Sequence, residues 1–228
     1  MKVIHIAGWS GSGKTTFILD LVSALAPFGK VGTIKHIGDH ICDLPAGKDT
    51  SRHYDAGASI VTGIDLEKSM ITHRTISLVA ALDTLSDAGV EFAVVEGFKN
   101  IPFQKAVMGD LDVPSLIKNP RVEEIIQLLP SFDDYYTISG LVREIGEVPW
   151  GVISSITGNI QDTLSPALSK ICSNLEDEIG RWEGVAGIRV KVQKAILHEH
   201  HRYFIIVITE TGMIGITALN RCMAALQV

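Results

Sequence analysis

The sequence predicts an α/β fold with a mostly parallel sheet, followed by a small α+β domain. Three observations predict it: an apolar strand runs into a glycine-rich turn and a helix, further short strands alternate with helices up to residue 97, and two long strands are consecutive from residue 188. Short apolar strands separated by helices favour a parallel sheet that is covered on both faces. At roughly 150 residues per domain, the length suits one large domain or two modest ones. The change of pattern along the chain favours two, at residues 1–146 and 147–228.

Elements of the first domain follow from hydrophobic periodicity and from helix-breaking residues. Pro27 and Gly29 end the first helix, and Gly89 and Gly97 bound a buried strand. Two runs of β-forming residues around positions 64–67 predict a hairpin. The expected strands are residues 2–7, 31–34, 59–62, 69–73 and 92–95, and the expected helices are residues 14–26 and 75–88.

The second domain begins after a break in the pattern at residues 140–149, where Gly146 and Pro149 stand. Its order is βαββα, which in about 80 residues is enough for a small α+β unit. The expected strands are residues 151–156, 188–197 and 203–209, and the expected helices are residues 165–181 and 215–226.

Composition excludes several classes of function. The net charge is −6 without a block of Lys or Arg, so we expect no nucleic acid and no anionic membrane as partners. No apolar run reaches the roughly 18 residues that a membrane span needs, and the N-terminus lacks the layout of a signal peptide. Cys42, Cys172 and Cys222 are far apart, which favours a reducing, cytoplasmic location over a disulfide or a cysteine-based zinc site.

The clearest motif is GWSGSGKTT at residues 8–16, which fits the phosphate-binding loop (P-loop) pattern G-x-x-x-x-G-K-[ST] between a strand and a helix. Glycines allow successive backbone N–H groups to point at phosphate oxygens, and the helix N-terminus adds a positive end. Lys14 is expected to reach the β- and γ-phosphates, and the Thr15 hydroxyl to hold Mg²⁺. The predicted phosphate-binding residues are Gly8, Ser10, Gly11, Ser12, Gly13, Lys14, Thr15 and Thr16.

Two further segments offer polar residues to the same edge of the sheet. Glu96 directly follows a buried strand, where a carboxylate can orient Mg²⁺ or a water, although a merely solvated carboxylate is the alternative. Lys35 and His36 follow the second strand, and a solvated polar loop is again the alternative to a site. The same loop-rich segment contains His40, Asp43, Lys48, Asp49 and Arg52.

These motifs, in this order and at this spacing, resemble the molybdopterin-guanine dinucleotide biosynthesis protein B (MobB) family: GWSGSGKTT, IKH with a following His, GKDTSR, AGA and VVEGFK, within residues 1–140. The resemblance implies a dimeric P-loop protein that binds GTP and Mg²⁺, has weak GTPase activity and assists the molybdopterin guanylyltransferase. Carried over by motif, the metal-side residues are Asp49, Glu96 and Thr15. The resemblance gives catalytic roles to Glu96 and Lys14. It adds Lys35, His36 and Arg52 as further binding residues.

Residues 147–228 resemble, more faintly, the large subunit of molybdopterin synthase (MoaE), through GVISSITG, EDEIGRWEGV, two long strands and a closing helix. That family uses lysines after the closing helix and a His-Arg pair at its start, whereas Thr211-Gly212-Met213 stands near that place here. We therefore expect a degenerate domain without synthase activity, which leaves molybdopterin as a possible ligand. The cluster His198–Arg202 predicts a solvated turn, with an anion contact or a metal site as alternatives.

The function expected is that of a GTP-binding accessory protein in molybdenum or tungsten cofactor biosynthesis. A scaffold that binds nucleotide or molybdopterin without hydrolysis is the main alternative. A small-molecule kinase would need a lid rich in arginine, and Arg52 and Arg74 are the candidates. A nickel-insertion GTPase would need a Cys/His site. Regulatory GTPases are poor matches, because no N-K-x-D or T-K-x-D segment follows the P-loop and no D-x-x-G switch appears within residues 1–146. The three tryptophans are expected to pack rather than to bind.

Overall fold

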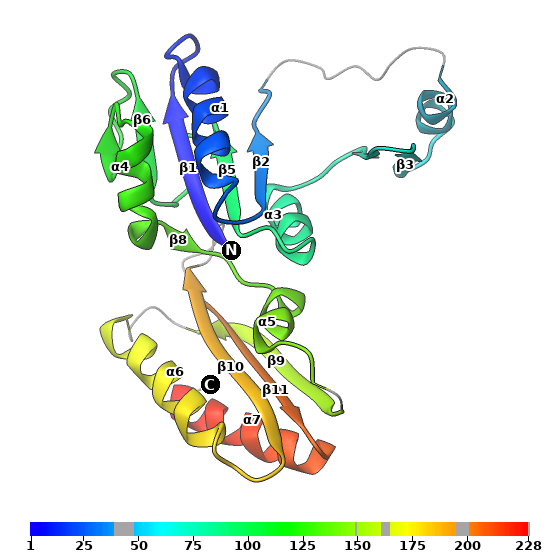
Figure 1. Cartoon of the computed structure of the whole chain (residues 1–228), viewed down its shortest axis with the longest axis vertical. Helices are drawn as coiled ribbons and strands as arrows, with labels where there is room; N and C mark the ends of the chain where they lie inside the picture. Colours follow the sequence, from blue (N-terminus) through cyan, green and yellow to red (C-terminus); the bar gives the residue numbers. More distant parts are fainter. Residues whose placement is uncertain (39–47, 149, 161–164, 195–200, 228) are drawn as a thin grey trace.

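The computed structural model describes residues 1–38, 48–148, 150–160, 165–194 and 201–227. Its N-terminal body is built on a six-stranded sheet of order β2-β5-β1-β6-β7, in which β8 pairs with β1 (Figure 1). Neighbouring strands are parallel except for the β1–β8 pair. The strands are β1 (Lys2–Gly8), β2 (Val31–Lys35), β5 (Phe92–Glu96), β6 (Lys105–Met108), β7 (Ile117–Lys118) and β8 (Asp133–Asp134).

Helices cover both faces of this sheet, as the sequence predicts. Successive residues of a strand point to opposite faces, so Ile4 and Ile6 of β1 pack with α1 and α4, whereas Val3 packs with Leu82 of α3. The helices of the body are α1 (Lys14–Leu25), α3 (Leu78–Asp87), α4 (Val122–Gln127) and α5 (Ile138–Ile145), with a 3₁₀ turn, η1, at Leu129–Ser131. Periodicity predicts no element between residues 98 and 137, yet β6, β7, α4, η1 and β8 lie there.

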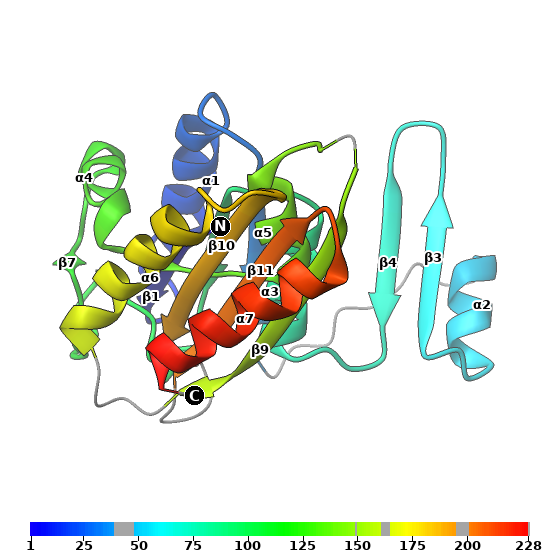
Figure 2. The ribbon, with the colours of Figure 1, turned by 90° about the horizontal axis from the view of Figure 1, so that it is seen from below.

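Residues 48–74 form an arm that extends away from the body in both ribbon views (Figures 1 and 2). The arm consists of α2 (Asp49–Asp55) and an antiparallel hairpin of β3 (Ile60–Ile64) and β4 (Ser69–His73), which confirms the predicted hairpin. Arg74 ties its parts together, because the guanidinium donates to Ala58 O at 3.0 Å and to Tyr54 O, and lies over the Tyr54 ring.

The C-terminal domain has the predicted βαββα order and an antiparallel sheet of order β10-β11-β9. On β11, Ile205 and Val207 face the core under α6 and α7, whereas Phe204 and Ile206 face the other side of the sheet. Both faces of the central strand are therefore buried. The elements are β9 (Val152–Ile160), α6 (Ser165–Ile179), β10 (Val185–Lys194), β11 (His201–Thr209) and α7 (Gly212–Leu226).

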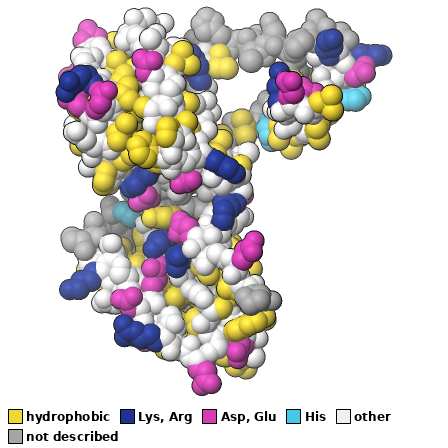
Figure 3. Space-filling model, in the orientation of Figure 1, with side chains coloured by type: hydrophobic (Ala, Val, Ile, Leu, Met, Phe, Trp, Pro, Cys, Tyr) yellow, Lys and Arg dark blue, Asp and Glu magenta, His cyan; other side chains and the backbone are white. Residues whose placement is uncertain are grey.

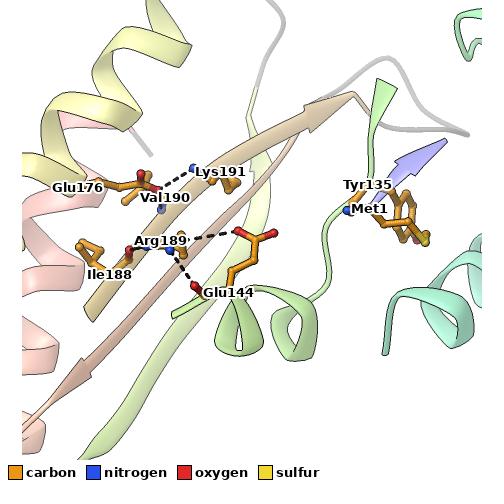
Figure 4. A network of polar contacts seen from close by, with 8 residues as sticks. All are labelled: Met1, Tyr135, Glu144, Glu176, Ile188, Arg189, Val190 and Lys191. Atoms are coloured by element: carbon orange, nitrogen blue, oxygen red, sulfur yellow. Dashed lines mark hydrogen bonds and ion pairs between the residues drawn. The ribbon is translucent and has the colours of Figure 1, made fainter. Parts of the chain in front are cut away.

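Helix α5 joins the two parts of the chain. Leu141 of α5 is fully buried against Phe204 and Ile206, so this helix covers the face of the C-terminal sheet that α6 and α7 leave open. Arg189 of β10 donates to Glu144 O at 2.8 Å and forms an ion pair with its carboxylate at 3.5 Å (Figure 4). A boundary between residues 146 and 147 stays a prediction, and α5, which precedes it, packs on the domain that follows it.

Among the described residues, no helix combines the length and apolar character that a membrane span requires.

Candidate functional site

A cavity of about 1080 Å³ opens where β1, β2 and β5 end, between the P-loop and the segment that follows β5. Parallel strands place their carboxyl ends at one edge of the sheet, which is the usual position of a ligand site in such folds. All of the P-loop residues predicted to bind phosphate line this cavity except Ser12, together with Lys35, His36 and Glu96. The structure therefore brings three separate predicted segments to one place.

The P-loop adopts the backbone that its glycines allow. Gly11 and Gly13 have φ of 77° and 81°, in the left-handed region that a side chain disfavours. Gly13 is the N-cap of α1 and has no side chain with which to cap it. The N–H groups of the first helical turn are thus left available to an anion, to which the helix N-terminus adds its positive end.

Lys14 is held inside the P-loop. Its Nζ donates to Trp9 O at 2.5 Å and lies 3.4 Å from Ser12 Oγ. Burial lowers the pKa of Lys14, and the nearby Glu96 carboxylate opposes this effect. Ser12, which does not line the cavity, therefore contributes to the site by positioning the lysine.

Glu96 is the single carboxylate among the described residues that line the cavity. Its side chain is only 13% exposed, and Oε1 lies 3.4 Å from Lys35 Nζ. The described residues contain no group of three or more His, Cys, Asp or Glu side chains that could hold a metal ion by themselves.

Residues 97–101, which we name the rim loop, complete the cavity. Gly97 has φ of 92°, and an added Cβ would lie 2.9 Å from His36 Cβ, so a glycine is required where the ends of β2 and β5 meet. The imidazole of His36 stacks on the ring of Phe98 at 4.5 Å. Lys99 Nζ lies 3.6 Å from the centre of the Trp9 ring. VVEGFK was recognised as a motif, but periodicity gives no role to its last two residues.

Tryptophan packing was predicted for all three residues. Trp182 packs against the C-terminal core, whereas Trp9 and Trp150 are about half exposed. The prediction of packing is therefore confirmed for Trp182 and is wrong for Trp9, whose ring lies at the surface under the Lys99 ammonium.

Two buried polar residues hold the rim loop from below, and neither was predicted. His5 Nε2 donates to Gly97 O at 2.6 Å, and Lys105 Nζ donates to Lys99 O at 3.0 Å and to Ile101 O at 2.8 Å. Burial lowers the pKa of His5 to about 4 and also lowers that of Lys105. The sequence signal was a charged or titratable residue within an otherwise apolar strand.

Asp49 and Arg52 are not among the described residues that line the cavity. Both lie on α2 of the arm, where their exposed side chains form an ion pair at 3.6 Å. Their assignment as binding residues stays a prediction. His40, Cys42 and Asp43 lie outside the described residues, as do His198, Glu199 and His200.

The family model and the relatives that match this sequence all refer to molybdopterin-guanine dinucleotide biosynthesis. The family model described as "Molybdopterin guanine dinucleotide synthesis protein B" matches residues 3–126. A Methanocaldococcus jannaschii relative is 30% identical over 154 residues, 64% of this chain, and the match spans 62% of the relative's length. The molybdopterin-guanine dinucleotide biosynthesis adapter protein of Haemophilus influenzae is 30% identical over 139 residues, 59% of this chain and 71% of its own.

Solved structures are also similar in part. The crystal structure of Bacillus subtilis MobB is 24% identical, with a TM-score of 0.44, and the match covers 52% of this chain and 77% of that one. Because the family model covers more than half of the sequence, including the P-loop, Glu96 and the rim loop, the chain belongs to the MobB family.

Proposed function

We propose that this protein is a GTP-binding accessory protein of molybdenum or tungsten cofactor maturation, with a slow GTPase activity. One observation carries the proposal: Lys14, Thr15 and Glu96 line the same cavity at the carboxyl edge of a parallel sheet, in a chain of the MobB family. A lysine for the β- and γ-phosphates, a hydroxyl for a metal and a carboxylate are the groups that P-loop NTPases use.

Mg²⁺ fits the oxygen atoms that the cavity offers. Thr15 and Glu96 supply a hydroxyl and a carboxylate, which are ligands that Mg²⁺ prefers, and the phosphates and water would complete the coordination. When bound, the ion neutralises charge on the phosphate oxygens. Glu96 would exchange its ion pair with Lys35 for this role, which frees the Lys35 ammonium for the phosphates.

We propose GTP rather than ATP as the ligand because the names of the relatives refer to a guanine dinucleotide. The test is a panel of GTP, ATP and their diphosphates, scored by calorimetric binding and by phosphate release with and without Mg²⁺. Binding and slow release that both favour GTP support the proposal. Failure to bind either triphosphate contradicts it.

We expect slow turnover because of which side chains line the cavity. Among its described lining residues there is neither an arginine nor a glutamine, the side chains that accelerate hydrolysis in many GTPases. We expect turnover below about 1 s⁻¹ for the protein alone. The same observation favours a second candidate function, a scaffold that binds nucleotide or molybdopterin without hydrolysis, and the phosphate-release measurement separates the two.

A small-molecule kinase is disfavoured by the placement of its candidate arginines. Arg74 is engaged with backbone oxygens of Ala58 and Tyr54, and Arg52 pairs with Asp49 on the arm.

The partner that we propose is the molybdopterin guanylyltransferase, since relatives are named adapter proteins of the dinucleotide's biosynthesis. A cytoplasmic location agrees with this partner.

A homodimer is part of the same proposal. The hairpin of the arm exposes apolar side chains, among them Ile64, Leu66 and Ile71, and apolar side chains are visible on the arm in Figure 3. Exposed apolar surface on a short hairpin is typical of a contact with another chain. The arm extends from the body, so it suits an exchange of contacts between two copies (Figure 1).

The C-terminal domain is proposed to be MoaE-like and to lack synthase activity. Its βαββα order supports the likeness. Thr211, the N-cap of α7, stands near the place where that family has a His-Arg pair. A synthase assay on the purified protein tests this part, and formation of molybdopterin would contradict it.

A further inference from the structure

The rim loop brings a third ammonium group to the candidate nucleotide site. Lys14, Lys35 and Lys99 all line the cavity, against the single carboxylate of Glu96 among its described residues. Lys35 pairs with Glu96, and Lys14 donates to the backbone of the P-loop. Lys99 differs from both, because its ammonium lies 3.6 Å from the centre of an exposed aromatic ring.

The backbone of Lys99 is held by hydrogen bonds, whereas its side chain is only partly buried. Its carbonyl oxygen accepts a hydrogen bond from the buried Lys105 ammonium at 3.0 Å, and the same ammonium donates to Ile101 O. His5, fully buried, holds the start of the loop through Gly97 O. These contacts leave the side chain of Lys99 free to exchange one partner for another by rotation about its own bonds.

A cation over an exposed aromatic ring is held weakly, whereas an ammonium that donates to a phosphate oxygen forms one of the strong hydrogen bonds of proteins. A triphosphate bound along the P-loop would therefore compete successfully with Trp9 for Lys99. Lys99 is near the P-loop lysine as well. Burial is the main cause of the lowered pKa of Lys14, and the charge of Lys99 acts in the same direction.

We propose that Lys99 is a catalytic residue, which leaves the Trp9 ring when a triphosphate binds and donates to the γ-phosphate oxygens as the β–γ bond breaks. This rests on the proposed nucleotide site. In the reaction a water oxygen forms a bond to the γ-phosphorus, and the bond to the bridging oxygen breaks with its electron pair staying on the diphosphate. The water's protons pass to phosphate and solvent. Lys99 transfers no proton and stabilises the developing charge, as an arginine finger does in other P-loop enzymes.

The test compares Lys99→Met with Lys99→Arg. Lys30→Met is the matched control, because Lys30 precedes β2 and so lies at the opposite edge of the sheet. We expect Lys99→Met to lower the rate of phosphate release from GTP and Mg²⁺ at least about tenfold, with a smaller change in the calorimetric Kd. Lys99→Arg restores part of the rate, and Lys30→Met has the wild-type rate. A wild-type rate in Lys99→Met, or a Kd that rises as much as the rate falls, overturns the assignment.

Trp9 fluorescence gives a second readout that does not depend on turnover. Its contribution is the difference between the wild type and Trp9→Phe, since Trp150 and Trp182 are common to both. GTP is expected to change this signal more than GDP does, and the difference should disappear in Lys99→Met. Equal signals with GTP and GDP, in a protein that calorimetry shows to bind both, contradict the movement of Lys99. If neither nucleotide binds to the wild type, the proposed nucleotide site itself fails.

Discussion

The imidazole of His5, fully buried in the centre of β1, donates from Nε2 to the carbonyl oxygen of Gly97 at 2.6 Å. Its Nδ1 atom is buried and has no hydrogen-bond partner among the described residues. The contact joins the middle of the sheet to the rim loop, 92 residues later in the chain. A side chain in the core thus sets the position of a segment that lines the candidate site.

Stability should therefore depend on the charge of His5. Burial lowers its pKa from 6.5 to about 4, so the folded protein binds a proton less readily than the unfolded chain. The contribution of neutral His5 is complete above pH 6.5 and is lost as the pH falls towards about 4. At 1.36 kcal/mol per pKa unit, the loss amounts to about 3 kcal/mol.

Denaturant unfolding at several pH values measures this effect. His5→Gln keeps a donor for Gly97 O and does not titrate, so its unfolding free energy should fall less between pH 6.5 and pH 4. If the unfolding free energies of the wild type and His5→Gln fall equally with pH, protonation of His5 is not the cause of the loss of stability.

Glu96→Gln should suppress hydrolysis while sparing the binding of GTP. Glutamine keeps the shape of the side chain and loses the charge that would serve the metal, and it also releases Lys35 from its ion pair. We expect phosphate release to fall at least about tenfold, with the Kd for GTP almost unchanged. Glu123→Gln, an exposed position on α4, serves as the control. Normal hydrolysis by Glu96→Gln would remove the carboxylate from the mechanism.

The arm should be required for dimer formation. Light scattering is expected to give twice the chain mass of 24.7 kDa for the wild type. Ile71→Asp places a charge on the exposed face of the hairpin and should shift the protein towards the monomer. Leu19→Asp makes the same kind of change on α1, outside the arm, and should not. A wild-type monomer at micromolar concentration would refute the dimer.

Leu141 should contribute strongly to stability because it is fully buried between α5 and the C-terminal sheet. Leu141→Ala is expected to lower the unfolding free energy by about 2–5 kcal/mol. Ile138→Ala, on the same helix but 38% exposed, should cost much less. Equal losses in guanidinium unfolding would mean that α5 does not pack on the second domain as described.

Local patterns were sufficient to predict the strand, P-loop and helix, because glycine spacing and apolar periodicity act over a few residues. They also predicted Glu96 at the end of a parallel strand, and the structure places it on the cavity with Lys14. The elements between residues 98 and 137 were not predictable in the same way. Strands β6 to β8 are two to four residues long, and such runs have too little periodicity to be distinguished from loops.

The roles of Lys99 and Lys105 depend on contacts between distant parts of the chain. Trp9 lies 90 residues before Lys99, and no local pattern relates the two. Asp49 and Arg52 show the reverse case. They are expected at the site because the GKDTSR segment resembles the MobB family, whereas the structure places them on α2 of the arm, and their role as binding residues stays a prediction.

The most direct test is the calorimetric titration of wild type and Lys14→Ala with GTP in the presence of Mg²⁺. Lys14 lines the cavity, and a charge-assisted contact of this kind is worth roughly 1.5–3 kcal/mol. The account predicts that wild type binds GTP and that Lys14→Ala binds it at least about tenfold more weakly with an unchanged unfolding transition. Equal affinity in the two proteins would contradict the assignment of the P-loop cavity as the nucleotide site.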